Sequence, residues 1–174
     1  VRRGRPAWSE FVHLLWTVWV FITPLFSGGF TLRWMLITLW SYPLFVLLYA
    51  ATLMVPRRSA PLYAMAMVVL SFVLLRSYPS GISYFIFGCV MLRTGRSRST
   101  PRYLLELAVL NAVFVALASW IGYPWQTIVW VPVISTIIGL IVNVERASSE
   151  KDAALRLSHE EVRRLAATAE RERI

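Results

Sequence analysis

Long apolar runs separated by short polar or basic stretches make up most of the first 144 residues. The runs lie at about 8–26, 34–55, 61–76, 79–93, 102–122 and 125–144. A helix needs roughly 20 apolar residues to cross a bilayer, and the first, second, fifth and sixth runs approach that length. The third and fourth are shorter, and the fourth could be a full span or a tilted or re-entrant piece. The pattern predicts an all-α membrane protein with about six transmembrane helices.

The composition favours the same class of protein. The chain is 57% hydrophobic and 16% charged, and its mean hydropathy is +0.60. A soluble domain of ordinary composition carries about 25% charged residues and is less apolar. We therefore expect an integral membrane protein, with residues 1–144 forming its membrane domain.

Basic residues are distributed unevenly between the loops that join the runs. Eleven Arg and only two acids lie in residues 1–144, so this part carries the whole net charge of +9. Nine of these arginines lie on one side of the predicted membrane, and only Arg33 and Arg76 lie on the other. The positive-inside rule then places both termini in the cytoplasm, which requires an even number of helices. Because the basic residues set topology in this way, we expect no nucleic-acid partner.

The positions of proline and tryptophan in the runs are typical of membrane helices. Pro43 and Pro132 fall inside runs and are expected to kink them. Trp34, Trp120 and Trp125 fall where the aromatic belt of the outer interface is expected. Pro132 would give the last membrane helix a place to bend.

The sequence contains few residues that could carry chemistry. The single cysteine, Cys89, lies in an apolar run, and no zinc-type spacing or nucleotide-binding motif is present. Polar residues at membrane depth are candidates for sensing or packing. His13 is one. Glu106 is another, although its position four residues after Arg102 favours pairing with that residue at the interface. Asn111 is expected to form a hydrogen bond between helices. We expect no cofactor and no metal in this chain, and no catalytic residue.

Residues 145–174 form a polar segment with seven basic and seven acidic residues, so its net charge is zero. Apolar residues alternate at spacings of three and four from Val144, as in a coiled coil, but the ends of this seam are weak. We name the set the tail seam and expect it to transmit a signal. Its members are Ser148, Leu155, Ser158, Val162, Leu165 and Ala169, with Lys151 as a further polar position. An amphipathic helix lying on the membrane is a less favoured alternative, because the segment lacks net positive charge and bulky aromatic residues.

The middle of the tail allows two helical arrangements. Ser158 and Glu161 match a capping box, and Leu157 and Val162 are spaced as a hydrophobic staple, so a helix could begin at Ser158. The same residues also fit one continuous helix that runs on from the last membrane run. A segment that can form one helix or two is a plausible switch element.

The final residues, "ATAERERI", resemble the segment that precedes the phospho-accepting histidine in DesK-like sensor histidine kinases. In that family an E-R-x-R-I run comes shortly before the histidine, and residues 170–174 match this run. The layout also agrees, because several membrane helices with short outer loops precede a cytoplasmic coiled coil. The resemblance implies that the histidine and an ATP-binding domain would follow Ile174, outside this chain.

The resemblance further implies a role and a set of partners. The chain would be the membrane sensor and signalling helix of a two-component kinase in the bacterial cytoplasmic membrane. It would respond to membrane lipids, form a homodimer, and reach a response regulator through the kinase core. ATP and Mg²⁺ would belong to that core. A small transporter or channel, or a structural membrane protein with a docking coiled coil, are the alternatives that the sequence leaves open.

Overall fold

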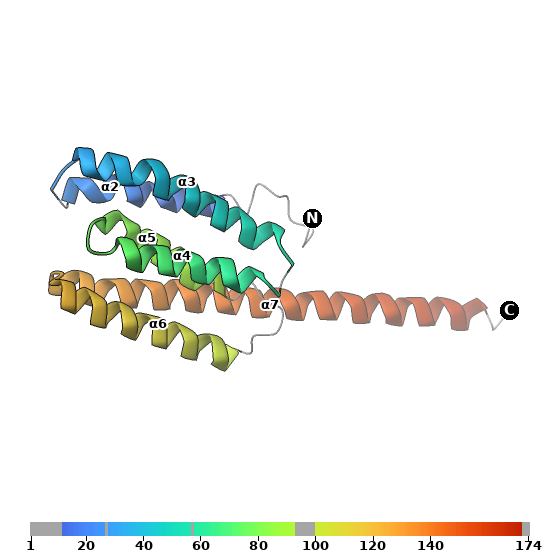
Figure 1. Ribbon diagram of the computed structural model, residues 1–174. Coiled ribbons are helices and arrows are strands. Elements are labelled where there is room, and N and C mark those ends of the chain that lie inside the picture. Colours follow the sequence, from blue (N-terminus) through green and yellow to red (C-terminus); the bar gives the residue numbers. More distant parts are fainter. Residues whose placement is uncertain (1–11, 27, 57, 93–99, 172–174) are drawn as a thin grey trace.

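The computed structural model describes residues 12–26, 28–56, 58–92 and 100–171, and these residues form helices joined by short turns. Figure 1 shows their order along the chain. The elements are η1 (Val12–Thr17), α2 (Val18–Phe26), α3 (Leu32–Met54), α4 (Ala60–Leu74), η2 (Pro79–Gly81), α5 (Ile82–Met91), α6 (Thr100–Ile121) and α7 (Trp125–Arg171). The described part of the chain contains no strand, as the hydropathy pattern predicts.

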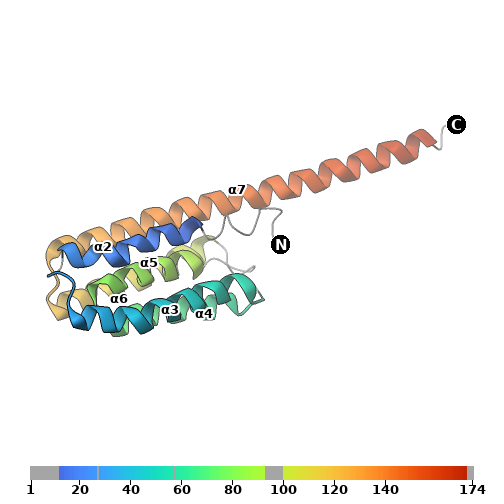
Figure 2. The ribbon, with the colours of Figure 1, turned by 90° about the horizontal axis from the view of Figure 1, so that it is seen from above.

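The helices form a bundle in two layers. Helices α3, α4 and α6 make up one layer and α2, α5 and α7 the other, as the two views show together (Figures 1 and 2). The turns on either side of η2 and between α6 and α7 lie at one end, which we call the hairpin end. The carboxyl-terminal half of α7 projects from the opposite end, which we call the tail end (Figure 2). The first described helix also begins at the tail end.

Among the described residues, three helices are long and apolar enough to cross a membrane. They are Leu32–Met54, Thr100–Ile121 and Trp125–Glu145. The other apolar helices, Leu15–Phe26, Ala60–Leu74 and Pro79–Met91, are shorter. The third and fourth runs are short as expected. Residues 8–11 of the first run lie outside the described residues, and its described part changes from a 3₁₀ helix to an α-helix at Val18.

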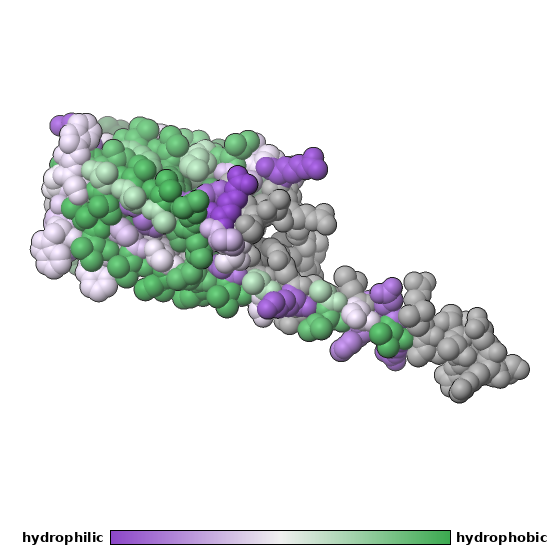
Figure 3. Space-filling view, turned by 90° about the horizontal axis from the view of Figure 1, so that it is seen from below, coloured by the Kyte–Doolittle hydropathy of each residue, from purple (hydrophilic) through white to green (hydrophobic). Residues whose placement is uncertain are grey.

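The outer surface of the bundle is apolar, unlike that of a water-soluble protein. Large hydrophobic side chains on α2, α3, α6 and α7 are exposed, among them Leu39, Leu47 and Leu105. Figure 3 shows this apolar surface over the bundle, and polar residues along the projecting part of α7. An exposed apolar surface of this extent marks contact with a membrane or a protein partner. With the three long apolar helices, it indicates membrane association.

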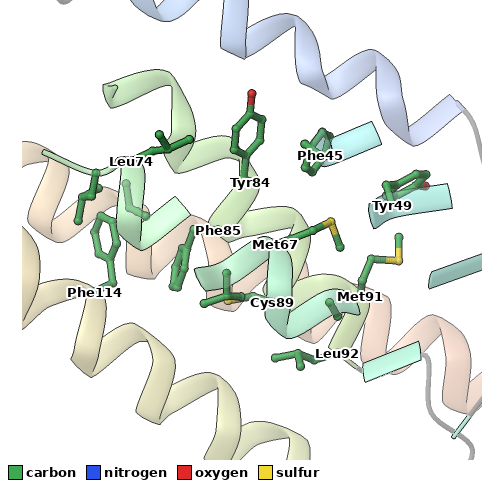
Figure 4. Close-up of a cluster of buried hydrophobic side chains, with 14 of the residues drawn as sticks. Phe45, Tyr49, Met67, Leu74, Tyr84, Phe85, Cys89, Met91, Leu92 and Phe114 are labelled. Atoms are coloured by element: carbon green, nitrogen blue, oxygen red, sulfur yellow. The ribbon is translucent and has the colours of Figure 1, made fainter. Parts of the chain in front are cut away.

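The core is centred on α4 and α5, which pack closely because Gly88 on α5 has no side chain. A Cβ atom at Gly88 on α5 would lie 2.6 Å from Val68 Cγ2 and 3.0 Å from the carbonyl oxygen of Ala64, both on α4. Aromatic rings extend the core on both sides of this contact (Figure 4). Phe45 stacks on Tyr84 with ring centroids 4.6 Å apart, and Phe85 stacks on Phe114 at 5.0 Å.

The turn between α6 and α7 fixes the two helices as an antiparallel pair. Gly122 has φ of +88° and ends α6 in the left-handed conformation that glycine adopts most readily. The backbone N–H of Tyr123 then donates to the carbonyl of Ala118. The Tyr123 hydroxyl donates to the carbonyl of Leu75 at 2.6 Å, and burial raises the pKa of Tyr123 to about 12. This bond ties the turn to the end of α4.

Candidate functional site

Helix α7 is the candidate functional element, because it belongs both to the bundle and to the polar tail. It continues without interruption from Trp125 to Arg171, which is 47 residues. The continuous alternative for the tail is therefore the one observed, and no helix begins at Ser158. Pro132 lies inside α7, and its carbonyl accepts a hydrogen bond from the Ser135 hydroxyl at 3.0 Å. The bundle end and the tail of α7 therefore belong to one continuous helix.

One narrow face of α7 packs against the bundle. Val131, Ser135, Gly139 and Asn143 are buried, and they recur at every fourth residue. Residues four apart lie on the same side of a helix, so these form one stripe, which we call the bundle face. Apart from Val131, its residues are small or polar. Helices in membranes use such residues to approach closely and to form hydrogen bonds.

Asn111 on α6 holds the bundle face through a buried hydrogen bond. Its side-chain oxygen accepts a bond from the Ser135 hydroxyl at 2.7 Å, and its amide nitrogen donates to the carbonyl of Leu107 at 2.9 Å. The hydrogen bond expected between helices at Asn111 is therefore confirmed. Both of its partner atoms lie in the interior, where the bond is not exchanged with water.

Glu106 lies at the edge of the bundle rather than in its centre. Its carboxylate is 3.5 Å from Arg102 Nε, four residues earlier on the same helix, and its side chain is 24% exposed. The pairing with Arg102 is thus confirmed, and the geometry favours the interface role over a buried functional carboxylate. His13 falls within η1, but its side chain lies outside the described residues.

The part of the bundle face nearest the tail end contains one tight contact and one unpaired group. A Cβ atom at Gly139 would lie 2.7 Å from the hydroxyl oxygen of Tyr103 on α6. That hydroxyl donates to the carbonyl of Cys89 at 3.4 Å. One turn further along α7, Asn143 is only 6% exposed, and its side-chain oxygen has no hydrogen-bond partner among the described residues.

The tail seam lies on the opposite side of α7 from the bundle face. Ser148, Leu155, Ser158 and Val162 are exposed, while the side chains of Leu165 and Ala169 lie outside the described residues. Successive residues turn by 100° about a helix axis, which places the seam roughly opposite the stripe from Val131 to Asn143. The seam is therefore available to a partner without disturbing the bundle.

The seam also extends backwards into the apolar part of α7. The same alternating spacing passes through Val144 and continues to earlier positions, all of which are between 42% and 65% exposed. These positions are Trp130, Ile134, Ile137, Ile141 and Val144. We call them the apolar extension of the seam. Sequence reasoning missed its relation to the bundle, because only burial shows which side of α7 the bundle occupies.

A second cluster missed from the sequence joins α3 to η2 and α5 near the hairpin end. Trp34 Nε1 donates to the Ser80 hydroxyl at 3.0 Å, and the hydroxyls of Thr38 and Tyr78 lie 2.7 Å apart. The hydroxyls of Ser41 and Tyr84 lie 3.2 Å apart. A signal was present, because Trp34, Thr38 and Ser41 are spaced by four and three on an otherwise apolar helix. The cluster fixes α3 and α5 relative to each other.

The described residues contain no group of His, Cys, Asp and Glu side chains that could hold a metal ion. The buried polar groups are hydroxyls and amides, which suit helix packing better than acid or base chemistry. Comparisons with family models, with curated proteins and with solved structures found no match to this chain. Functional inference therefore rests on the geometry of α7 and on the resemblance at its end.

Proposed function

We propose that this chain is the membrane sensor and signal-transmission region of a two-component sensor histidine kinase. The observation that carries the proposal is α7, a single helix that begins inside an apolar bundle and ends 26 residues beyond its last apolar segment. Such a helix converts a change in the bundle into a change in the tail. The resemblance of residues 170–174 to DesK-like kinases supports a phosphotransfer domain as the recipient of that change.

The proposal includes a topology in the bacterial cytoplasmic membrane. All six apolar helices cross the bilayer, and the hairpin end faces outward. Arg33 and Arg76 belong to the hairpin end, whereas Arg58 and Arg102 belong to the tail end. This distribution supports a cytoplasmic tail. Trp120 and Trp125, which flank the α6–α7 turn and are largely exposed, support an interface at the hairpin end.

The tail seam supports a homodimer as the signalling unit. Leu155 and Val162 are 59% and 62% exposed, and a second α7 packed in parallel would cover them. Ser148, Lys151 and Ser158 weaken this seam, because polar seam residues reduce coiled-coil stability. A weak seam can change its packing in response to a small force. Phosphate would then pass to a response regulator from a kinase core that binds ATP and Mg²⁺.

Membrane lipids are the proposed source of the signal. Mismatch between helix length and bilayer thickness costs fractions of a kcal/mol per Å, and helices respond by tilting. The helices most sensitive to thickness are the short ones, α4 (Ala60–Leu74) and the segment Pro79–Met91. Their contacts with α3 and α7 would pass the change to the tail.

A fusion experiment tests the proposal. Residues 1–174 are joined to a histidine kinase core that lacks its own membrane region, and autophosphorylation is measured in bilayers of increasing acyl-chain length. We expect the rate to depend on thickness. Inserting seven residues after Glu160 should preserve the response, because one heptad keeps the seam in phase, whereas inserting four should change it. A rate independent of thickness, temperature and both insertions would rule out signal transmission through α7.

A further inference from the structure

We propose that α7 has two registers against α6, one helical turn apart, and that a hydrogen bond between Tyr103 and Asn143 is specific to the second. In the described register, Ser135 binds Asn111. The second register belongs to the same bundle and requires no kinase. It takes its biological meaning from the proposed role of α7, but its contacts and its test concern α6 and α7 alone.

The first observation is the unpaired amide of Asn143. Its side chain is 6% exposed, and its oxygen lacks a partner within the described part of the chain. A buried acceptor without a partner is unfavourable, since it has lost water and gained nothing in return. Asn143 is also the last residue of the bundle face, where α7 leaves the bundle. The described register is therefore incompletely satisfied at this point.

The second observation is a donor one turn away on the facing helix. The Tyr103 hydroxyl lies directly against Gly139, the residue four positions before Asn143. Its bond to the Cys89 carbonyl is 3.4 Å long, well beyond the 2.5–3.0 Å usual between a hydroxyl and an oxygen. A shift of α7 by about 5.4 Å toward the hairpin end brings Asn143 to the place of Gly139. Tyr103 then exchanges the long bond for a short one to the Asn143 oxygen.

The exchange is balanced at the other contact. The same shift places Gly139 opposite Asn111, so the bond from Ser135 is lost, while Asn111 keeps its bond to the Leu107 carbonyl. Between α6 and α7 one bond replaces another of the same kind, while the accompanying shift of the α6–α7 turn breaks the bond from Tyr123 to the Leu75 carbonyl. At the place of Gly139, the atoms nearest to an added Cβ belong to the side chains of Tyr103 and Leu107. Both are side-chain ends rather than backbone.

The two registers differ at both ends of α7. In the second register, Gln126 moves away from the bilayer at the hairpin end, and Val144 moves into it at the tail end. A rotation of α7 or a loss of packing has no such reciprocal effect. This opposite movement gives the test its readout.

The test measures the labelling rate of single cysteines with a water-soluble maleimide in lipid nanodiscs, which leave both faces accessible. Gln126→Cys and Val144→Cys are each made in a Cys89→Ala background, since Cys89 is the one native cysteine. Adding Ser135→Ala should raise labelling at position 126 and lower it at position 144, so that the ratio of the two rates rises by about threefold, the usual effect of one hydrogen bond within a membrane protein. Asn143→Leu and Tyr103→Phe should each abolish both changes.

Ser71→Ala is the matched control. Ser71 on α4 is the other buried polar side chain without a partner among the described residues, but it does not lie on α7. Its replacement should leave labelling at both positions unchanged. Asn143→Val serves as a second variant if Asn143→Leu fails to fold. The proposal is overturned if Ser135→Ala changes both positions in the same direction, or if its effect persists without the Asn143 amide or the Tyr103 hydroxyl.

Discussion

The Ser135 hydroxyl on α7 donates to the Asn111 side-chain oxygen on α6 at 2.7 Å, and this is a buried side-chain hydrogen bond between the two helices. It lies midway along the apolar part of α7. The bond connects the helix that leaves the bundle to the helix that precedes it. The donor and the acceptor are not equivalent, so replacing Ser135 and replacing Asn111 should change the stability of the bundle by different amounts.

Replacing Ser135 should destabilise the bundle more than replacing Asn111. Ser135→Ala leaves the Asn111 oxygen buried without a partner in this register, at a cost of about 1–3 kcal/mol. Asn111→Leu leaves Ser135 with the Pro132 carbonyl at 3.0 Å, so its hydroxyl remains bonded. Unfolding of both single variants and the double variant in mixed micelles gives the coupling energy. A double variant no less stable than Asn111→Leu alone is expected, and additive losses would contradict the pairing.

Gly88→Ala should disrupt the contact between α4 and α5. The added methyl group would meet Val68 Cγ2 at 2.6 Å and backbone atoms at 3.0 and 3.1 Å, and backbone cannot move aside. We expect a loss of about 1–3 kcal/mol in the free energy of unfolding, as for other overpacked cores. Gly139→Ala is the comparison, because its nearest neighbour is the end of the Tyr103 side chain. Equal losses at the two glycines would show that the backbone contact is not the cause.

The pair of Thr38 and Tyr78 should also respond asymmetrically. Thr38 donates its hydroxyl hydrogen to the Trp34 carbonyl at 2.8 Å, so Tyr78 must be the donor in the bond between the two hydroxyls. Thr38→Val then removes the acceptor on α3 for the buried Tyr78 hydroxyl, whereas Tyr78→Phe leaves Thr38 bonded to the Trp34 carbonyl. Thermal unfolding should show the larger loss for Thr38→Val, about 1–3 kcal/mol. The reverse order would contradict the assignment of the donor.

Strengthening the tail seam should fix one signalling state. Ser148→Leu with Ser158→Leu adds apolar area to a seam that two copies would share, and burying a leucine contributes about 1.5–3 kcal/mol. In a protein that includes the kinase core, autophosphorylation should then lose its dependence on the membrane. Glu160→Leu, on the side of the tail away from the seam, is the control and should leave the response intact. A normal response in the double variant would show that the seam does not carry the signal.

The phenol of Tyr123 should lose its proton at a higher pH than an ordinary tyrosine does. Its pKa is raised from 10.0 to about 12 by burial, so the folded protein favours the protonated form. The stability that this provides is complete below pH 10 and is lost as the pH rises toward 12. The difference in near-ultraviolet absorbance between the native protein and Tyr123→Phe isolates this step. A difference titration centred at pH 10 would mean that the Tyr123 hydroxyl is solvated rather than bonded to Leu75.

Hydropathy predicts most of this fold because the described part of each apolar run is almost entirely helical. The helical character of the described parts of the runs and the local pair of Arg102 and Glu106 follow from spacing within one segment, whereas spacing left open whether the tail is one helix or two. Contacts between segments are harder to predict from the sequence. Asn111 could be predicted to bond across helices, but its partner could not be identified, since Ser135 becomes close only when α6 and α7 pack antiparallel.

Other features depend wholly on the packing of distant segments. The contact of Gly88 with Val68 requires α4 and α5 to be placed first, and glycines in apolar helices are too common to mark it. The bonds from α3 to Ser80 and Tyr78 require the chain to fold back at η2. For the tail, spacing identifies the seam, while only the burial of Asn143 and Gly139 shows that it faces away from the bundle.

The unbroken course of α7 makes the tail a lever arm. The 26 residues that follow Glu145 extend about 40 Å from the bundle at 1.5 Å per residue. A tilt of about 10° at the membrane therefore displaces Arg171 sideways by about 7 Å, more than the length of one helical turn. A domain attached after Arg171 would therefore move farther than the part of α7 within the bundle does.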